Sequence, residues 1–408
     1  MPRVLFLLPS LPLPVTGGSP LRSLQLLRAT ETLCETHAYA LTPHRALDTY
    51  PTTWWAATTS HRPPDVDART MLDWARQADG HPTDRLWTAD AQRDLAGVLE
   101  RVQPDVAVVT LAARRAMAML RATVSWVVYD AHNVEGPLYQ GQLAAATASG
   151  NRKPSGLLRL VSRRTTEVEA ALVGDVDQIW TCSETDSAAI RGAYPGAAPT
   201  VVVPNTVAVP GELPKRPAGK DVELLFPANF DYFPNIAAAR WLCEELMPRL
   251  WDGHPSARLL LVGSAGRERL KELRASTEHE PRIEISGFVV STEPYFARAS
   301  IVVVPLREGS GTRMKVLEAF AAGVPVVSTA KGVEGLAVRD TIHYLRAESG
   351  AEFQTGVLTV WTDPDQTAAR CAAAFRLAGE RYGTAAAVAA IGSALGIHLS
   401  SGLRLDVT

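Results

Sequence analysis

The sequence predicts an α/β protein made of two doubly wound domains, each with a largely parallel sheet between layers of helices. Two observations lead to this fold class. Short apolar runs alternate with helical periodicity along most of the 408 residues, which is typical of strand–helix–strand units. The apolar runs are continuous, so the strands are expected to be buried on both faces, as in parallel sheets. The length is sufficient for two cores of ordinary size.

The apolar runs give the predicted strands. In the first half of the chain they lie at Val4–Leu8, Val106–Thr110, Trp126–Tyr129, Gln178–Thr181 and Val201–Val203. In the second half they lie at Glu223–Pro227, Leu259–Val262, Ile283–Ser286, Ile301–Pro305 and Val326–Ser328. Helical periodicity occurs between strands, at Ser19–Glu31, Leu157–Val173, Ile236–Leu250 and Arg313–Ala322. This alternation implies right-handed crossovers.

A stretch rich in proline, glycine and charge separates the two strand–helix series. It covers residues 207–220 (VAVPGELPKRPAGK) and has the composition of an interdomain linker. We therefore predict one domain at residues 1–206, another at residues 221–375, and a C-terminal helical segment at residues 376–408. Ligands of open α/β sheets bind outside the carboxyl ends of the strands, so two such domains facing each other would form one interdomain cleft. Pro51–Arg69 has no clear period and is predicted to be an irregular excursion.

Composition excludes several classes of protein. The formal net charge of −2 disfavours a surface that coats nucleic acid. The cysteines are widely spaced, which predicts small core residues in a reducing compartment and neither a disulfide framework nor a zinc site. No targeting segment or membrane span is evident, so a soluble cytoplasmic protein is expected. The basic, leucine-containing stretch Asn151–Arg164 has two interpretations: weak contact with the inner face of an anionic membrane, or an amphipathic surface helix.

The sharpest motif follows the predicted strand Ile301–Pro305. A loop at Arg307–Gly311 (REGSG) leads into a helix. Gly309 and Gly311 allow backbone N–H groups to turn toward a ligand, and the start of a helix attracts anions. The hydroxyl of Thr312 and the charges of Arg313 and Lys315 add to this end of the helix. We call residues 309–315 the phosphate cradle, because the pattern fits a diphosphate.

Glu318 lies two helical turns after Gly311 and shares its face, where a carboxylate can accept bonds from vicinal hydroxyls such as those of a ribose. A simpler interpretation of the whole motif remains. Ser310 or Thr312 would then cap the helix, and Lys315 and Glu318 would form a solvated i,i+3 pair.

The first domain has one informative segment, Val127–Leu138 (VVYDAHNVEGPL). A strand ends there and delivers Asp130, His132, Asn133 and Glu135 to the ligand edge of the sheet. A lone histidine is usually a packing or capping residue, but a polar cluster directly after a buried strand favours a functional one. Asp130 could orient the imidazole or act as a cap. Asp-x-Asp pairs at residues 65–67, 175–177 and 363–365 are interpreted as chance, and no metal site is predicted.

These segments resemble the family 4 glycosyltransferases of the GT-B fold, in the subgroup with a GTRxK-type loop followed by a KVLEA helix. The resemblance is carried by GTRMKVLEAF together with FPANFDYFPNIAAARWLCEEL, RLLLVG, ISGFV and VVPN, and is strongest over Phe226–Leu336. It implies two Rossmann-like domains facing an interdomain cleft. It also implies a nucleotide-sugar donor held mainly by the C-terminal domain, transfer with retention of anomeric configuration, and no requirement for a metal ion.

In the C-terminal domain, Glu318 matches the second glutamate of the family's motif of two glutamates, which binds the donor ribose. The first glutamate falls on Ser310, so Glu308 or backbone groups of the loop are expected to take over its contacts with the donor sugar. The family often has an arginine and a lysine after the first strand of this domain. Residues 228–239 contain no basic residue, so Arg313 and Lys315, with Arg307, are expected to meet the diphosphate charge.

The resemblance assigns further positions. Gly287 and Phe288 match the residues that grip the base. Asn229 and Asn235 are further candidate donor contacts, and the start of the next helix is the alternative for Asn235. His132 matches the family's active-site histidine, which contacts the donor sugar and stabilises charge at the reacting carbon. Gly17 and Gly18 match a glycine turn that approaches the donor phosphates or the acceptor; two glycines in a surface turn are the alternative.

The implied function is that of a retaining glycosyltransferase. It would move a sugar from a nucleotide-diphosphate sugar to a hydroxyl of a surface polysaccharide or a small natural product, with no cofactor beyond this co-substrate. Two alternatives use the same scaffold. A nucleotide-sugar epimerase would show no dependence on an acceptor, and a catalytically silent subunit would bind the nucleotide sugar without turnover. The presence of His132 favours an active enzyme.

Overall fold

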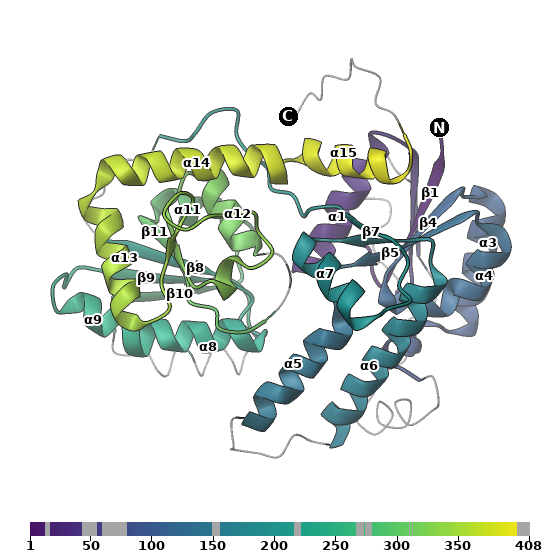
Figure 1. The fold of residues 1–408 in the computed structure, drawn as a ribbon, viewed down its shortest axis with the longest axis horizontal. Helices are drawn as coiled ribbons and strands as arrows, with labels where there is room; N and C mark the ends of the chain where they lie inside the picture. The colour runs from purple at the N-terminus through teal and green to yellow at the C-terminus, as the bar shows by residue number, and fades with distance from the viewer. Residues whose placement is uncertain are drawn as a thin grey trace. The chain divides into compact units, whose positions relative to one another are not determined.

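The computed structural model describes residues 1–12, 17–42, 80–148, 156–215, 222–266, 273, 280–309, 311 and 313–397, and the backbone of 55–58. The chain divides into two compact units (Figure 1). The first contains Met1–Asn205 and Thr384–Thr408, and the second contains Thr206–Gly383. Each unit has a sheet of its own, in which every neighbouring pair of strands is parallel.

The first unit has a seven-stranded sheet in the order β3-β2-β1-β4-β5-β6-β7. Its strands are β1 (Arg3–Leu8), β2 (Glu35–Ala40), β3 (Trp55–Thr58), β4 (Val106–Val109), β5 (Trp126–Ala131), β6 (Gln178–Thr181) and β7 (Thr200–Val202). Its helices are α1 (Gly18–Glu31), α3 (Ala89–Val102), α4 (Met117–Thr123), α5 (Glu135–Ala148), α6 (Gly156–Asp175), α7 (Glu184–Ala193) and α15 (Thr384–Ala394). Helices α5 and α6 pack side by side (Figure 1).

Strand β1 shows why the apolar runs are continuous. Val4, Phe6 and Leu8 pack into a core that contains residues of α1 and α15. Leu5 and Leu7 point the other way, into a core that contains residues of α3 and α4. Because successive side chains of a strand face opposite sides of the sheet, a strand covered on both sides needs an apolar residue at every position. The predicted fold class is confirmed.

The second unit has a six-stranded sheet in the order β10-β9-β8-β11-β12-β13. Its strands are β8 (Glu223–Pro227), β9 (Arg258–Val262), β10 (Ile283–Gly287), β11 (Ile301–Val304), β12 (Val326–Ser328) and β13 (Leu345–Arg346). Its helices are α8 (Phe233–Trp241), α9 (Met247–Trp251), α11 (Glu293–Arg298), α12 (Met314–Ala321), α13 (Gly350–Thr362) and α14 (Pro364–Tyr382). Strand order reverses between β8 and β11, and ligands of doubly wound sheets bind at such a reversal.

Every predicted strand is present, but β2, β3 and β13 were not predicted. The sequence of β2, ETHAYA, has polar residues at its first three positions and so no apolar run. Within the predicted irregular excursion, four residues form β3, which pairs with β2; the rest of that stretch lies outside the described residues. Residues 207–215 of the predicted linker have neither helix nor strand.

The C-terminal end of the chain is divided between the two units. The predicted boundary at residue 375 falls inside α14, which belongs to the second unit through buried residues such as Ala374 and Ala378. After Gly383 the chain returns to the first unit, where Ala387, Val388 and Ile391 of α15 are buried in its core. The prediction of one C-terminal helical segment at residues 376–408 is therefore corrected.

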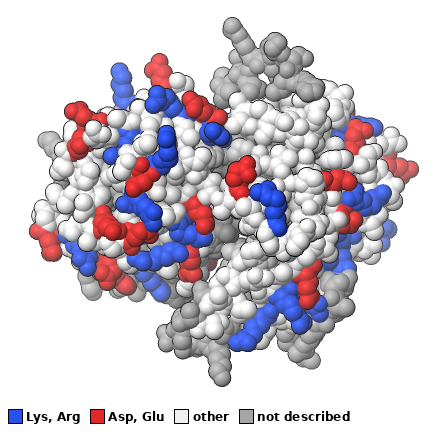
Figure 2. Space-filling view, viewed as in Figure 1, with Lys and Arg blue, Asp and Glu red and all other residues white. Residues whose placement is uncertain are grey.

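The surface and the cysteines agree with the composition. Basic and acidic side chains are interspersed over the face shown in Figure 2. All four cysteines are buried and none forms a disulfide, as predicted for core residues. No helix in the described parts of the chain is both long and apolar enough to cross a membrane.

Gly263, directly after β9, is a position where the fold requires glycine. Its φ is +141°, and a Cβ there would lie 1.9 Å from the carbonyl oxygen of Ala228. We expect Gly263→Ala to lower the free energy of unfolding by about 3 kcal/mol or more, because the clash is with backbone. Gly253 is the control, since a Cβ there meets no atom within 4 Å. Urea titration of both variants checks this, and equal stabilities would contradict it.

Candidate functional site

The loop between β11 and α12 lies at the reversal of strand order in the second unit. Gly309 and Gly311 both have positive φ, at 103° and 84°. A Cβ at Gly309 would come within 2.9 Å of the hydroxyl of Tyr232, so glycine permits a close approach of the loop to the start of α8. Helix α12 begins after Arg313, whose side chain does not cap it. Ser310 and Thr312, predicted as donor contacts or caps, lie outside the described residues.

Lys315 joins the first turns of α8 and α12. Its Nζ donates to Oδ1 of Asn235 at 3.0 Å and lies 4.0 Å from the centre of the Phe226 ring. Phe226 is in β8 and Asn235 is in the first turn of α8, so the ammonium group lies between the two helix starts that flank the reversal. A cation held over an aromatic face with one amide acceptor keeps donor capacity for a further ligand.

Burial brings the pKa values of Lys315 and Glu318 toward each other. The pKa of Lys315 is lowered to about 7, first by burial and then by the charge of Arg313. The pKa of Glu318 is raised to about 7 by burial, against the opposing effect of Lys315. Both groups can therefore change charge near neutral pH when a ligand arrives. Perturbed ionisable groups of this kind are typical of binding and catalytic sites.

Arg313 stabilises the backbone of the phosphate cradle by hydrogen bonds. It is 5% exposed and donates to the backbone oxygens of Gly309 at 3.0 Å and Lys331 at 3.2 Å. Its Nη2 is 3.7 Å from a carboxylate oxygen of Glu334. The guanidinium thus fixes the course of the glycine loop and adds positive charge behind it.

The other predicted donor contacts of this unit are spread over the carboxyl edge of the sheet. Asn229, after β8, accepts from the backbone N–H of Asp231 at 2.9 Å and so shapes the loop into α8. Gly287 ends β10 at one side of the sheet, with a φ of +74°, and Phe288 follows it and is 66% exposed. Glu308 is half-buried in the glycine loop.

Arg307 is directed away from the phosphate cradle. Its side chain is exposed and donates to the backbone oxygen of Glu348 at 3.2 Å. Its guanidinium carbon is 5.8 Å from the ring of Trp241. The guanidinium of Arg307 thus contacts the backbone just before α13. Arg313 and Lys315 lie at the glycine loop, and the Arg307 guanidinium lies at its margin.

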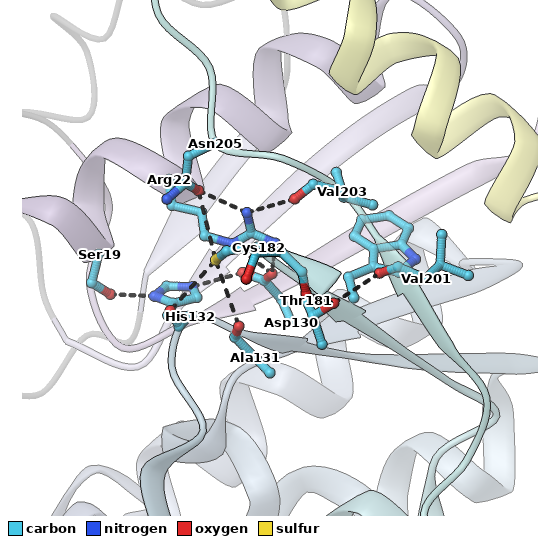
Figure 3. A network of polar contacts seen from close by, with 12 residues as sticks. Ser19, Arg22, Asp130, Ala131, His132, Thr181, Cys182, Val201, Val203 and Asn205 are labelled. Atoms are coloured by element: carbon cyan, nitrogen blue, oxygen red, sulfur yellow. Dashed lines mark hydrogen bonds and ion pairs between the residues drawn. The ribbon is translucent and has the colours of Figure 1, made fainter. Parts of the chain in front are cut away.

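In the first unit, His132 lies directly after β5 at the centre of a polar network (Figure 3). Its Nε2 is 2.7 Å from Oδ2 of Asp130, and its Nδ1 is 2.5 Å from Oγ of Ser19. Ser19 follows Gly17 and Gly18, so the predicted glycine turn and the predicted histidine meet at one place. A Cβ at either glycine would meet no atom within 4 Å.

Arg22 is the residue of this network that the sequence did not reveal. It is 2% exposed, and its Nε and Nη2 donate to Oδ1 of Asp130 at 2.8 and 2.6 Å. Its Nη1 donates to the backbone oxygen of Val203 at 2.9 Å and to Oδ1 of Asn205 at 2.7 Å. A signal was present: in the predicted helix Ser19–Glu31, Arg22 is one turn before Leu26 on the buried face.

Asp130 is a buried carboxylate that stays charged. Burial alone would raise its pKa, but the charges of Arg22 and then His132 outweigh this and the pKa of Asp130 is lowered. A charged carboxylate beside an imidazole holds one tautomer of the ring.

The remaining members of the predicted polar cluster have a structural role. Glu135 begins α5 and accepts from Nδ2 of Asn133 at 3.3 Å. The carboxylate of Glu169, which is fully buried, accepts from the backbone N–H groups of Glu135 and Gly136 at 2.9 and 2.7 Å. Glu169 also accepts from the hydroxyl of Tyr194 at 2.6 Å. These bonds fix the start of α5 just after His132.

Comparisons with known proteins agree with this picture. Residues 221–375 match the family model of the group 1 glycosyl transferases, so the matched region includes the phosphate cradle, Asn235 and Glu318. A comparison with curated protein sequences returned no match.

Several solved structures have the same fold. Sucrose-phosphate synthase from Thermosynechococcus elongatus has a TM-score of 0.72 and 15% identity, over 97% of this chain and 98% of that one. HepE of Anabaena, solved with UDP and glucose, has a TM-score of 0.66 and 16% identity, over 97% and 100% of the two chains. A glycosyltransferase from Rickettsia africae has a TM-score of 0.63 and 12% identity, over 97% of each chain.

These likenesses show the GT-B fold for the chain. Together with the matched domain, they support a glycosyltransferase of the GT-B type. Among the residues that the structure describes, no group of three or more His, Cys, Asp or Glu side chains is arranged to hold a metal ion. The absence of a metal requirement stays a prediction.

Proposed function

We propose that this protein is a retaining glycosyltransferase that moves a sugar from a nucleotide-diphosphate sugar to a hydroxyl acceptor. The observation that carries the proposal is the position of Lys315. Its ammonium group bridges to Asn235 at the reversal between β8 and β11, beside a glycine loop and the start of α12. A doubly wound sheet binds nucleotides at this place, and the surrounding residues match a glycosyltransferase domain.

The phosphate cradle binds the diphosphate of the donor. Backbone N–H groups at the start of α12 and the ammonium group of Lys315 meet its negative charge. Arg313 keeps the glycine loop in the shape that exposes those N–H groups. Glu318 accepts bonds from the ribose hydroxyls in its charged form, and Gly287 and Phe288 are proposed to contact the base.

The same groups stabilise the leaving diphosphate. When the sugar–phosphate bond breaks, negative charge builds up on the phosphate oxygens and positive charge on the anomeric carbon. Fixed donors aimed at developing charge are worth about 2.7–4 kcal/mol each in comparable sites. The protein's own cations supply this stabilisation in the proposed reaction, which therefore needs no divalent ion.

His132 acts on the sugar side of the reaction. Asp130 remains charged beside it, so negative charge behind the imidazole favours the positive charge that develops as the anomeric carbon becomes electron-poor. The acceptor hydroxyl attacks from the face that the diphosphate leaves, and the departing phosphate oxygen takes its proton. This front-side course retains the anomeric configuration.

A panel of nucleotide sugars tests the proposed function. Uridine diphosphate sugars come first, because HepE was solved with UDP-glucose. Each donor is incubated with and without glycan and small-molecule hydroxyl acceptors, in the presence of a chelator, and products are read by NMR. Acceptor-dependent transfer with retained configuration is expected. Conversion of the sugar without an acceptor would favour an epimerase, and binding without turnover would favour a silent subunit.

Donor binding is expected to take up a proton above neutral pH. The pKa of Lys315 in the free protein is about 7, and a bound diphosphate favours its ammonium form, so affinity for UDP should fall as the pH rises beyond that value. At pH 8 most Lys315 side chains are neutral in the free protein. Proton uptake on binding should therefore approach one per UDP, about equal to that neutral fraction. Calorimetry in buffers of different ionisation enthalpy measures this. Lys315→Met should abolish the uptake, and an unchanged value would contradict the assignment.

A further inference from the structure

His132 has two nitrogens in different surroundings, and only one of them faces outward. Nε2 is buried and lies 2.7 Å from Oδ2 of Asp130. Nδ1 lies 2.5 Å from the hydroxyl of Ser19, which is an exposed residue. A substrate group that hydrogen-bonds to a nitrogen of this ring must therefore meet Nδ1, in the place of Ser19 or beside it.

The neighbours of the ring fix its tautomer. A lone pair on Nε2 would face the charged oxygen of Asp130 at 2.7 Å and be repelled by it, so this nitrogen carries the proton. Nδ1 then presents a lone pair and accepts from the Ser19 hydroxyl. The outward nitrogen, Nδ1, can thus accept a hydrogen bond. This tautomer requires that Asp130 remain charged and in place.

Arg22 controls both the charge and the position of Asp130. Two of its nitrogens donate to Oδ1 alone, which leaves Oδ2 for His132. Its third nitrogen is held by Val203 and Asn205, so the guanidinium has a fixed position in the interior. Without Arg22, a fully buried carboxylate would lose its strongest cation and would tend to take up a proton, and as an acid it could donate to the ring.

We propose that Arg22 is a positioning residue for the reaction: through Asp130 it holds His132 in the tautomer whose Nδ1 faces substrate. This inference rests on the proposed function where it concerns turnover. The arrangement itself, Ser19–His132–Asp130–Arg22–Asn205, joins α1, the end of β5 and the segment after β7 within the first unit (Figure 3).

The experiment compares Arg22→Gln, Arg22→Lys and Leu26→Ala. Leu26 is on the same helix, is 2% exposed and packs into the apolar core, so its truncation weakens α1 without touching the polar network. The histidines are labelled with ¹⁵N, the His132 signals are assigned with a His132→Gln variant, and spectra are recorded at alkaline pH. Steady-state kinetics and the dissociation constant for UDP are measured on the same samples.

Arg22→Gln should convert the single Nε2–H tautomer of His132 into a mixture. It should lower kcat by about 10²-fold, the cost of a displaced catalytic group, and leave the dissociation constant for UDP within about twofold. Arg22→Lys should restore part of both properties, because an ammonium group keeps Asp130 charged. Leu26→Ala should keep the tautomer and the wild-type kcat at temperatures where it is folded.

Two results would overturn the inference. One is a single Nε2–H tautomer in Arg22→Gln, and the other is a fall in kcat no larger than that of Leu26→Ala. Failure of the proposed function looks different. In that case the wild-type protein transfers no sugar under any condition, while the tautomer comparison still decides whether Arg22 positions His132.

Discussion

Lys315→Ala is expected to weaken UDP binding by about 10²-fold and to lower kcat/KM by about 10³-fold. The ammonium group lies at the reversal of strand order between β8 and β11, where it contacts Asn235 and Phe226. Removing the ammonium group takes away a positive charge that stabilises the bound diphosphate. The same charge stabilises the diphosphate still more as it leaves. The effect on kcat/KM therefore exceeds the effect on binding. Calorimetry with UDP and steady-state kinetics with the donor measure the two quantities.

Arg298→Ala is the matched control for this loss of charge. Arg298 pairs with Glu223, the first residue of β8, so it lies at the opposite edge of the same sheet. Its removal should change UDP binding by less than about twofold, because exposed ion pairs contribute little and the site is distant. Equal losses of UDP affinity in Arg298→Ala and Lys315→Ala would indicate a general effect of charge and would contradict a binding site at Lys315.

Arg313→Ala should act through the shape of the loop as well as through charge. The side chain donates to the backbone of Gly309 and Lys331, and its removal leaves these carbonyls without their partner. We expect UDP binding to fall at least as far as in Lys315→Ala. Arg313→Lys should not restore it, because an ammonium group lacks the planar fork that reaches both oxygens.

His132→Ala is expected to lower kcat by about 10²- to 10³-fold while UDP affinity stays within about twofold. The proposed diphosphate contacts all belong to the second unit, whereas His132 belongs to the first. The imidazole acts on the sugar as charge develops, so its loss is felt in the transition state and not in the binding of UDP. Kinetics with the donor and calorimetry with UDP separate the two effects.

His37→Ala provides the comparison for this variant. His37 is in β2 of the same sheet and pairs with Glu35 at 3.1 Å, away from the Asp130 network. It should retain the wild-type kcat. If kcat of His132→Ala matches the wild type, His132 takes no part in the reaction. If UDP affinity falls together with kcat, the role of His132 is in binding.

The sequence predicted most strands of both sheets and the glycine loop before α12, because these depend on local patterns. Runs such as Ile301–Val304 are apolar at every position, and this reports burial on both faces directly. The glycines and the Lys315 of the β11–α12 loop are close in sequence, so their spacing alone places them at one helix start. Strand β2 escaped prediction because ETHAYA lacks such a run.

The parts that escaped prediction depend on contacts between distant segments. Arg22 and Asp130 are separated by 108 positions, and Arg22 and Asn205 by 183. No spacing rule links an arginine in the first helix to a carboxylate at the end of β5. The return of α15 to the first unit is of the same kind, since an alanine-rich helix carries no sign of which core it will join.

The most direct test of the central claim is a crystal structure of the protein with a bound uridine diphosphate sugar. The claim is that the start of α12 and Lys315 hold the diphosphate with the protein's own charge. We expect phosphate oxygens within hydrogen-bond distance of the Lys315 ammonium group and of backbone N–H groups at the α12 start. Phosphates bound elsewhere in the protein, or bridged to it by a divalent cation on carboxylates, would contradict it.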